Sequence, residues 1–375
     1  MRIAFIYDAV YPWEKGGAQK RIWELARRLA EDHDVHYFGM HYWDGSPTME
    51  REGVTFHGVC EPSDLYTDGR RSITQAIRFA THLIPALRGE SFDIIDCQEF
   101  PYFPIFATKL HSLIDRSTLV VTWYEVWDDY WYDYLGWKRA FGKLVENITV
   151  HLPDHVIPIS TFIADDVRDI GGSKSISVVE NGVDVERIQS IEGRDPTEVV
   201  YFGRLSEHKN VDWLLEAIEK ASTDLDRPID TTIIGDGPER DRLEARADEL
   251  GVSDYVSFEG FIEDDDDVIA RIQASKIFVL PSIREGFPNT ILEANACGVP
   301  SIVVEAPENG STAVVEDGIT GRIVDPKPAA IADAITETLS DDELRKRLSK
   351  GAREYGEAHD WGVIVEELEK VYESL

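Results

Sequence analysis

The sequence is poor in cysteine and in long apolar runs, and each shortage excludes a class of protein. Cys60, Cys97 and Cys297 are the only cysteines, and no Cys-x-x-Cys pair occurs. We therefore expect no disulfide framework and no structural zinc site, and interpret the three as buried thiols in a reducing cytoplasm. No apolar run reaches the roughly 20 residues that a membrane-spanning helix needs. The chain opens on a strand-like segment at residues 2–7, which is not typical of a signal peptide.

Positive charge is scarce as well. The chain has 38 lysines and arginines against 71 aspartates and glutamates, a net charge of −33. This balance argues against nucleic-acid binding, which needs a basic footprint. The acidic residues are spread along a chain that is 43% hydrophobic, rather than gathered in a tail. Such a dispersed acidic surface indicates a protein kept soluble in concentrated salt, and we hypothesise an origin in a halophilic archaeon.

Strand-like and helix-like segments alternate along the chain, whose 375 residues suit two domains better than one core. The first half predicts strands at 3–7, 35–38, 54–59, 92–96, 118–122 and 155–159, and helices at 18–31, 72–87, 104–113 and 137–150. The second half predicts strands at 199–202, 231–234, 256–258, 277–280, 301–304 and 321–324, and helices at 211–221, 239–250, 267–274, 290–297 and 328–339. The tail from Asp341 reads as helix to its end. This alternation predicts an α/β fold with two doubly wound parallel sheets.

The most informative stretch is residues 285–293, Glu-Gly-Phe-Pro-Asn-Thr-Ile-Leu-Glu. It follows a predicted buried strand, so Glu285 lies in the loop at the carboxyl end of that strand and Glu293 on the next helix. Ligands of open α/β sheets bind at this edge. Pro288 suits the first helical turn, whose unpaired N–H groups attract anions. The stretch therefore predicts a phosphate site between two carboxylates, formed with Gly286, Phe287, Pro288, Asn289 and Thr290.

Seven ordered motifs carry a family resemblance: Gly16-Gly17, residues 179–184, Gly203-Arg204-Leu205 with Lys209, and residues 234–238, 258–261, 285–293 and 316–321. The chain resembles the retaining glycosyltransferases of family 4 over essentially its whole length. The resemblance implies the GT-B fold, with two facing Rossmann-like domains. It implies acceptor binding by residues 1–186, donor binding by residues 187–357, and a C-terminal helix, 358–375, that crosses back to the first domain.

Arg204 and Lys209 are the predicted groups for the leaving phosphate. Sugar transfer from a nucleotide diphosphate leaves negative charge there, which positive groups stabilise. Both residues follow a predicted strand end; an arginine forks two phosphate oxygens, and a lysine acts as a point charge. Taken alone they read equally well as surface charges, and it is the resemblance that implies a catalytic role.

Gly16 and Gly17 stand just before the first predicted helix, where glycines permit close backbone approach and helix N–H groups attract anions. The resemblance implies that this loop touches the donor; two glycines alone would indicate an ordinary loop. The pair lacks Gly-x-Gly-x-x-Gly spacing, which argues against a dinucleotide dehydrogenase.

The two glutamates of residues 285–293 receive separate roles from the resemblance. Glu293 is expected to bind the ribose hydroxyls and Glu285 the hydroxyls of the transferred sugar. A covalent nucleophile at Glu285 is a lower-ranked alternative to front-face attack, in which the leaving phosphate helps to deprotonate the acceptor. Phe261 and Ile262 either shelter the base or pack in the core. We expect no metal, because no Asp-x-Asp motif occurs where one is needed and residues 263–267 read as a solvated loop.

The acceptor side departs from the family pattern. Many relatives carry a histidine after the strand at 118–122, where this chain has Tyr124. Tyrosine donates hydrogen bonds but is a poor base near neutral pH. Tyr124, Glu125 and Asp8 are candidate acceptor contacts.

Aromatic and basic residues gather in the same half. Four arginines and no acidic residue occur between Arg70 and Arg88, and Lys138, Arg139 and Lys143 add to them. This contrast fits a helix on an anionic membrane, or salt bridging inside the domain. The accompanying aromatic residues indicate a helix core or a sugar or lipid platform: Trp123, Tyr124, Trp127, Tyr130, Trp131, Tyr132, Tyr134 and Trp137.

Together these features predict a metal-independent retaining glycosyltransferase that needs no cofactor and uses a UDP- or GDP-sugar as donor. The expected acceptor is a glycan or a lipid-linked glycan, and the expected location is the cytoplasm, extending to the inner face of the membrane. Two alternatives stay open: a sugar-nucleotide epimerase of the same architecture, and a non-catalytic glycan- or nucleotide-binding protein.

Overall fold

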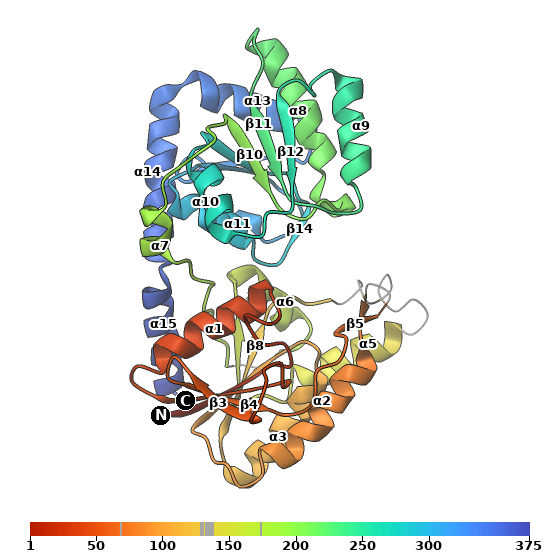
Figure 1. Ribbon diagram of the computed structural model, residues 1–375, viewed down its shortest axis with the longest axis vertical. Coiled ribbons are helices and arrows are strands. Elements are labelled where there is room, and N and C mark those ends of the chain that lie inside the picture. Colours follow the sequence, from red (N-terminus) through yellow and green to blue (C-terminus); the bar gives the residue numbers. More distant parts are fainter. Residues whose placement is uncertain (68–69, 128–130, 132–138, 173–174) are drawn as a thin grey trace. The chain divides into compact units, whose positions relative to one another are not determined.

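The computed structural model describes residues 1–67, 70–127, 131, 139–172 and 175–375, and it divides into two compact units (Figure 1). Unit 1 comprises Met1–Asn181 together with Trp361–Leu375, and unit 2 comprises Gly182–Asp360. Each unit is an α/β domain with its own sheet and core, as the alternating pattern predicts.

Unit 1 is built on a seven-stranded sheet of order β3-β4-β2-β1-β7-β8-β9. Six strands are parallel: β1 (Arg2–Ile6), β2 (Asp34–Gly39), β4 (Val54–Gly58), β7 (Ile94–Gln98), β8 (Thr118–Trp123) and β9 (His155–Pro158). The edge strand β3 (Thr48–Arg51) is antiparallel and was not predicted, because its residues are polar and half exposed. The central strands are buried along their length, which explains why they read as apolar runs.

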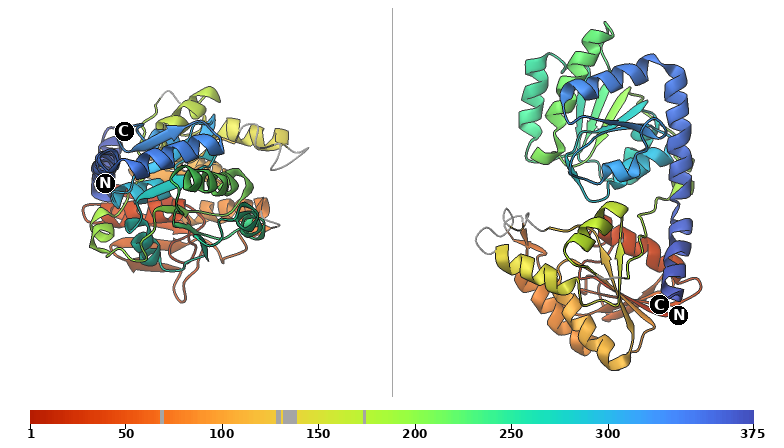
Figure 2. Two further views of the ribbon diagram at one scale, coloured as in Figure 1. Left: turned by 90° about the horizontal axis from the view of Figure 1, so that it is seen from above. Right: turned by 180° about the vertical axis from the view of Figure 1, so that it is seen from behind.

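The helices of unit 1 cover both faces of this sheet. They are α1 (Gly17–Leu29), α2 (Ile73–Ala86), α3 (Phe103–Asp115), α5 (Arg139–Thr149) and α6 (Thr161–Asp169). The crossover through α1 runs from β1 to β2, whereas those through α2, α3 and α5 run the opposite way along the sheet. Right-handed crossovers therefore place α2, α3 and α5 on the face opposite α1 (Figures 1 and 2).

The C-terminal helix α15 (Trp361–Glu373) belongs to unit 1, in agreement with the expected return to the first domain. Trp361, Ile364 and Leu368 join the core beside α1. The tail predicted as helical from Asp341 consists of two helices, because α14 (Asp342–Ala358) ends before α15 begins. The chain passes between the units at this break, where the carbonyl of His359 accepts the N–H of Val183 at 2.9 Å.

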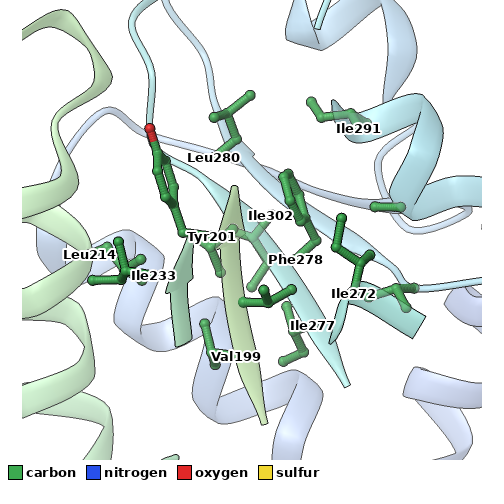
Figure 3. Close-up of a cluster of buried hydrophobic side chains, with 14 of the residues drawn as sticks. Val199, Tyr201, Leu214, Ile233, Ile272, Ile277, Phe278, Leu280, Ile291 and Ile302 are labelled. Carbon is green, nitrogen blue, oxygen red and sulfur yellow. The ribbon is translucent and has the colours of Figure 1, made fainter. Parts of the chain in front are cut away.

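Unit 2 contains a six-stranded parallel sheet of order β12-β11-β10-β13-β15-β17. The strands are β10 (Val199–Phe202), β11 (Thr231–Ile234), β12 (Val256–Gly260), β13 (Ile277–Leu280), β15 (Ser301–Val304) and β17 (Gly321–Val324), and five of the six have the predicted bounds. Figure 3 shows their inward side chains, among them Val199 and Phe278, packed against Leu214, Ile272 and Ile291 from the flanking helices.

The longer helices of unit 2 are α8 (Val211–Asp224), α9 (Arg240–Leu250), α10 (Asp265–Gln273), α11 (Asn289–Ala296), α13 (Pro328–Ser340) and α14; α7 (Val185–Ser190) and α12 (Ser311–Val314) are short. The acidic run at 263–267 is not the predicted loop, because its last three residues form the first turn of α10. Asp264 caps this helix by accepting the N–H of Asp266 at 3.0 Å. Aspartates in a first turn are stabilised by the helix dipole, which explains the run.

Two smaller predictions also need comment. Cys97 and Cys297 are buried as expected, but Cys60 is only half-buried. Among the residues that the structure describes, none of the helices is long and apolar enough to cross a membrane.

Candidate functional site

The carboxyl edge of the unit 2 sheet brings together two of the three predicted catalytic residues. Lys209 ends the short 3₁₀ helix η2 (Glu207–Lys209) after β10, and Glu285 lies in the two-residue strand β14 (Arg284–Glu285) after β13. The Nζ of Lys209 lies 2.5 Å from Oε1 of Glu285. Both side chains are largely buried, with 17% and 12% of their surface exposed. The opposite charges therefore attract each other more strongly than an exposed pair would.

Main-chain contacts hold the loops after β10 and β13 against each other. The N–H of Ile283 donates to the carbonyl of His208 at 3.1 Å, and Nδ2 of Asn210 donates to the carbonyl of Pro281 at 3.4 Å. These bonds join residues more than 70 positions apart in the sequence. The positions of Lys209 and Glu285 are thus set by the backbone as well as by their own ion pair.

Asn309 is a supporting residue that the sequence reasoning missed. It is 1% exposed and lies in β16 (Glu308–Asn309), which pairs with β14. Its Nδ2 donates to the carbonyls of Ser282 at 2.9 Å and Val304 at 2.7 Å, and the next N–H, of Gly310, donates to the carbonyl of Glu285 at 2.7 Å. An Asn-Gly pair after a buried strand is the available signal. Asn309 is therefore a positioning residue for Glu285.

Two glycines in this region are required by close backbone approach. A Cβ on Gly310 would lie 2.2 Å from the carbonyl oxygen of Gly286. A Cβ on Gly235, whose φ is +135°, would lie 1.9 Å from the carbonyl oxygen of Gly203. Only glycine fits such approaches. The glycines of these motifs are thus explained by packing of the site loops.

Arg204 follows β10 directly and is exposed. Its main-chain carbonyl accepts the hydroxyl of Tyr201 at 3.1 Å, which fixes the backbone of the turn. Its guanidinium forms no ion pair with any residue in the described ranges, whereas Lys209 is paired. Arg204 thus presents an uncompensated positive charge at the same sheet edge.

Helix α11 lies beside this pair. Pro288 is the residue before the helix and is buried, rather than part of its first turn as predicted, and Asn289 is the first helical residue. Thr290 follows in the first turn, and Glu293 is half-buried one turn further on. Helix α11 begins four positions after Glu285, and the positive end of its dipole therefore lies at the same edge of the sheet.

The remaining donor candidates differ in exposure. Phe261 is 72% exposed, whereas Ile262 and Phe287 pack against the unit 2 core. Gly16 and Gly17 belong to unit 1, where Gly16 has an extended backbone and directly precedes α1. Of the two roles considered for Ile262, its surroundings therefore fit core packing. The donor contacts of all these residues stay predictions.

In unit 1, Asp8 follows β1 and is fully buried. Its Oδ1 forms an ion pair with Arg71, whose side chain is 4% exposed. Burial raises the pKa of Asp8, and the positive charge of Arg71 opposes this rise. The Asp8 carboxylate is thus already engaged inside the protein, and an acceptor contact by it stays a prediction.

Tyr124 and Glu125 lie just beyond the carboxyl end of β8. The Tyr124 hydroxyl donates to Oε1 of Gln98 at 2.7 Å, and burial raises the pKa of Tyr124 well above its usual value. This agrees with the prediction that Tyr124 is a poor base. Glu125 accepts the indole N–H of Trp127 at 2.6 Å.

The aromatic residues near this edge are partly core residues. Trp123, Trp127 and Trp131 are buried, and Trp131 donates to Oε2 of the buried Glu146 at 3.0 Å. These three fit the core interpretation. Tyr130, Tyr132, Tyr134, Trp137 and Lys138 lie outside the described residues.

Asp96 and Glu99 are buried acids that the sequence reasoning did not single out. Asp96 lies in β7, and Glu99 is the first residue after this strand. The other residues of the strand are apolar apart from Gln98. Glu99 is 2% exposed; burial, and then the charge of Glu125, raise its pKa well above the usual range. Asp96 accepts the hydroxyls of Thr122 at 2.9 Å and Tyr372 at 2.6 Å, and burial raises its pKa to about 6.

Asp96 predicts a pH dependence of stability. Its folded-state pKa lies above the unfolded value near 3.9, so its contribution is full below about pH 4 and is lost as pH rises through 6. Relative to Asp96→Asn, the wild type should lose about 3 kcal/mol of unfolding free energy between pH 4 and pH 8. Urea unfolding of both proteins across this range measures the difference, and a difference that does not change with pH would contradict it.

No cluster of three or more histidine, cysteine, aspartate or glutamate side chains suited to a metal occurs within the described part of the chain.

Two family models match the chain, one for each half. Residues 15–187 match "Glycosyltransferase Family 4", and residues 184–355 match "Glycosyl transferases group 1". Together they cover most of the chain, so both halves are similar to glycosyltransferase domains. The two-domain α/β architecture agrees with the predicted GT-B fold.

Curated relatives carry related names. LpsE of Rhizobium meliloti, a lipopolysaccharide core biosynthesis glycosyltransferase, is 32% identical over 199 residues, which are 51% of this chain and 56% of that protein. MJ1069 of Methanocaldococcus jannaschii, an uncharacterized glycosyltransferase, is 26% identical over 258 residues, 66% of this chain and 62% of that protein. The chain thus spans less than two thirds of the length of these relatives.

Solved structures match over the whole chain. Sucrose-phosphate synthase from Thermosynechococcus elongatus aligns with a TM-score of 0.77 at 19% identity, covering 100% of this chain and 98% of that one. HepE of Anabaena in complex with UDP also gives 0.77 at 19% identity, covering 100% of both chains. At this identity the likeness shows the fold alone.

Proposed function

We propose that the protein is a retaining, metal-independent glycosyltransferase that moves a sugar from a nucleotide diphosphate sugar to a glycan or lipid-linked acceptor. The observation that carries the proposal is the largely buried Lys209–Glu285 pair, held at the sheet edge where the exposed Arg204 also lies. We assign donor binding to unit 2 and acceptor binding to unit 1, with Asp8, Tyr124 and Glu125 as candidate acceptor contacts.

The ion pair suggests how a donor is received. A diphosphate carries more negative charge than one carboxylate, so it also attracts Lys209. Arg204 adds a forked contact, and the positive end of the α11 dipole favours the same anion. Charge that develops on the leaving phosphate is then met by positive groups already in place. The Lys209 ammonium has three N–H donors, so it meets the phosphate and stays paired with Glu285, whose second oxygen accepts hydrogen bonds from the sugar.

The same pair bears on the route to retention. A carboxylate held by an ammonium group at 2.5 Å is a weaker nucleophile than a free one. This favours a hydrogen-bonding role for Glu285 over a covalent glycosyl-enzyme intermediate. We infer that the acceptor attacks from the face that the phosphate leaves, with a phosphate oxygen taking the proton. Glu293 would bind the ribose, and Phe261 would cover the base.

The donor nucleotide and the setting are part of the proposal. HepE has been solved with UDP and with UDP-glucose, which makes UDP the first nucleotide to test, with GDP second. LpsE is named for lipopolysaccharide core biosynthesis, which supports a glycan or lipid-linked acceptor. We place the protein in the cytoplasm, in peripheral contact with the inner face of an anionic membrane.

Thermal unfolding with nucleotides tests the proposed function. A ligand at about 100 times its Kd stabilises a protein by roughly 2.7 kcal/mol. We expect UDP or GDP to raise Tm of the wild type and of the control Arg242→Ala, but less so that of Arg204→Ala, with no change on adding EDTA. Stabilisation by neither nucleotide would contradict the donor site. Binding without transfer to any acceptor would favour the binding-protein alternative.

The acidic composition gives a separate prediction for salt. Circular dichroism in a KCl series should show folding that strengthens toward molar salt, because screening relieves the repulsion of a −33 net charge. Complete folding without added salt would contradict the halophilic hypothesis, while leaving the proposed reaction unaffected.

A further inference from the structure

Exposed apolar side chains concentrate on three helices of unit 1. Sixteen large hydrophobic side chains in the described residues are exposed, and ten of them lie on α2, α3 and α5. They are Ile73, Ile77, Ile84, Phe106, Leu110, Leu113, Ile114, Phe141, Leu144 and Ile148, with Leu113 and Ile114 exposed by 70% and 75%. We call the surface that these ten residues form the outer face.

The outer face is a second apolar stripe on helices that already bury one. On α2, Ile73 and Ile77 are four positions apart, and on α3 Phe106, Leu110 and Leu113 follow the helical repeat. Each of these two helices also has buried residues, such as Phe79 on α2, that pack inward. Helices α2, α3 and α5 cover one side of the sheet together (Figure 2), and the side chains of their second stripes are exposed. Large exposed apolar patches are rare on soluble monomers and typically mark a surface that binds a partner or a membrane.

The charge of these helices is opposite to that of the chain. Together α2, α3 and α5 contain four basic residues and only two acidic ones. Neither acidic side chain lies at the surface: Glu146 is fully buried, and Asp115 is 9% exposed and 3.1 Å from His111. Among the basic residues, Lys109 pairs at 2.9 Å with Asp154, which lies outside these helices. In a chain of net charge −33, this is a basic apolar surface.

An apolar pocket opens between α2 and α5, at one border of the outer face. It is an open depression whose empty space, counted together with the solvent at its mouth, is about 420 Å³. It is lined mainly by apolar and aromatic side chains, including Ile73, Phe100, Phe103, Trp131 and Phe141. Ile73 and Phe141 belong both to this lining and to the outer face. The pocket is therefore continuous with the exposed apolar surface.

The deep wall of the pocket is fixed by buried polar contacts. Glu146 accepts the hydroxyl of Tyr102 at 2.9 Å and the indole N–H of Trp131 at 3.0 Å, which holds both rings in place. Another lining residue, Arg71, is ion-paired with Asp8 at the carboxyl edge of the sheet. Phe100 directly follows the buried Glu99. The pocket thus connects the apolar face to the edge where the acceptor candidates lie.

We propose that the outer face lies on an anionic bilayer and that the pocket holds the hydrocarbon chain of a lipid-linked acceptor. This rests on the proposed function and names the acceptor class. Apolar stripes enter the acyl region while the basic residues meet anionic head groups. The acidic excess of the chain lies outside these helices and would be repelled by such a membrane, so charge also favours this orientation. A second copy seated on the same face would oppose like charges.

Vesicle flotation of the full chain tests the face. The vesicles contain equal parts of phosphatidylglycerol and phosphatidylcholine, in the salt where the protein is folded. Leu113→Gln with Ile114→Gln should lower binding by about tenfold or more, because two apolar side chains no longer enter the bilayer. The control Ile319→Gln removes an apolar side chain that is 53% exposed in unit 2 and should not change binding. No binding by the wild type, or a change of oligomeric state in place of lost binding, would overturn the proposal.

Fluorine NMR with 5-fluorotryptophan tests the pocket. The Trp131 resonance, assigned with Trp131→Phe, should shift on adding dodecyl phosphate below its micelle concentration but not on adding butyl phosphate. Phe141→Gln, at the pocket mouth, should weaken the shift, and Trp361, packed beside α1, should not respond. No shift at Trp131 would overturn the pocket assignment.

The two proposals fail separately. Nucleotide stabilisation measured on the same variants reports on unit 2 alone and should remain at the wild-type level. If the wild type binds nucleotide but does not float with the vesicles, only the membrane proposal is overturned. If the wild type floats but is not stabilised by UDP or GDP, the proposed reaction is overturned.

Discussion

Replacing Arg204 or Lys209 by alanine should each lower kcat by about 100- to 1,000-fold, or roughly 2.7–4 kcal/mol of transition-state stabilisation. Arg204 is exposed and forms no ion pair with the described residues, so its loss removes a charge that only the ligand would use. Lys209 differs because its loss also leaves Glu285 without its partner at 2.5 Å. We therefore expect Lys209→Ala to raise KM for the donor as well.

Steady-state transfer from UDP- and GDP-sugars measures both effects. Lys346→Ala is the matched control, because Lys346 pairs with Glu343 at 2.8 Å on the same unit but with side chains 70% and 85% exposed. Exposed pairs contribute little, so this variant should keep wild-type kcat and stability. A Lys209→Ala enzyme with unchanged kcat would mean that the Lys209–Glu285 pair is structural.

A double-mutant cycle separates the roles of Lys209 and Glu285. If they act only through each other, Lys209→Ala should cause no further loss of kcat in a protein that already carries Glu285→Gln. If each also meets the donor, the double variant should be slower than either single one. Equal rates for all three variants would support a purely mutual role.

Much of unit 2 could be predicted from the sequence, because buried parallel strands read as uninterrupted apolar runs. Val199–Phe202 and Ile277–Leu280 have the predicted bounds for this reason. The loops that follow them were recognised from glycines and charges. Their contacts were not, since Asn309 reaches Ser282 across 27 positions and no local pattern records such a bond.

Unit 1 shows where sequence patterns stop being informative. The short strand β3 was missed because its residues are polar and half exposed. The break before α15 lies in a tail whose sequence favours helix on both sides, and it was the resemblance, which implies a C-terminal helix from 358, that placed a boundary close to it. Asp96 lies inside a buried strand, where the other residues are mostly apolar. An acidic residue in such a run is the sequence signal that could have identified it as a buried acid.

Replacing Arg71 by methionine should lower the unfolding free energy of unit 1 by about 3–5 kcal/mol, because it leaves the fully buried Asp8 without its charge partner. The loss should shrink as pH falls, since a buried carboxyl avoids the cost of an unpaired charge by taking up a proton. Adding Asp8→Asn should restore part of the stability for the same reason.

Urea unfolding followed by near-ultraviolet circular dichroism measures this loss, with Arg168→Met as the matched control. Arg168 pairs with Asp165 at 2.6 Å in the same unit, but the two side chains are 55% and 75% exposed, so its loss should cost less than about 1 kcal/mol. Equal costs for the two variants would mean that the buried pair is no stronger than a surface pair. The same set of proteins decides the role of Asp8, because an Asp8→Asn enzyme that is stable but fails to transfer would place this carboxylate on the acceptor, whereas one that is unstable and active would make it a structural anchor for Arg71.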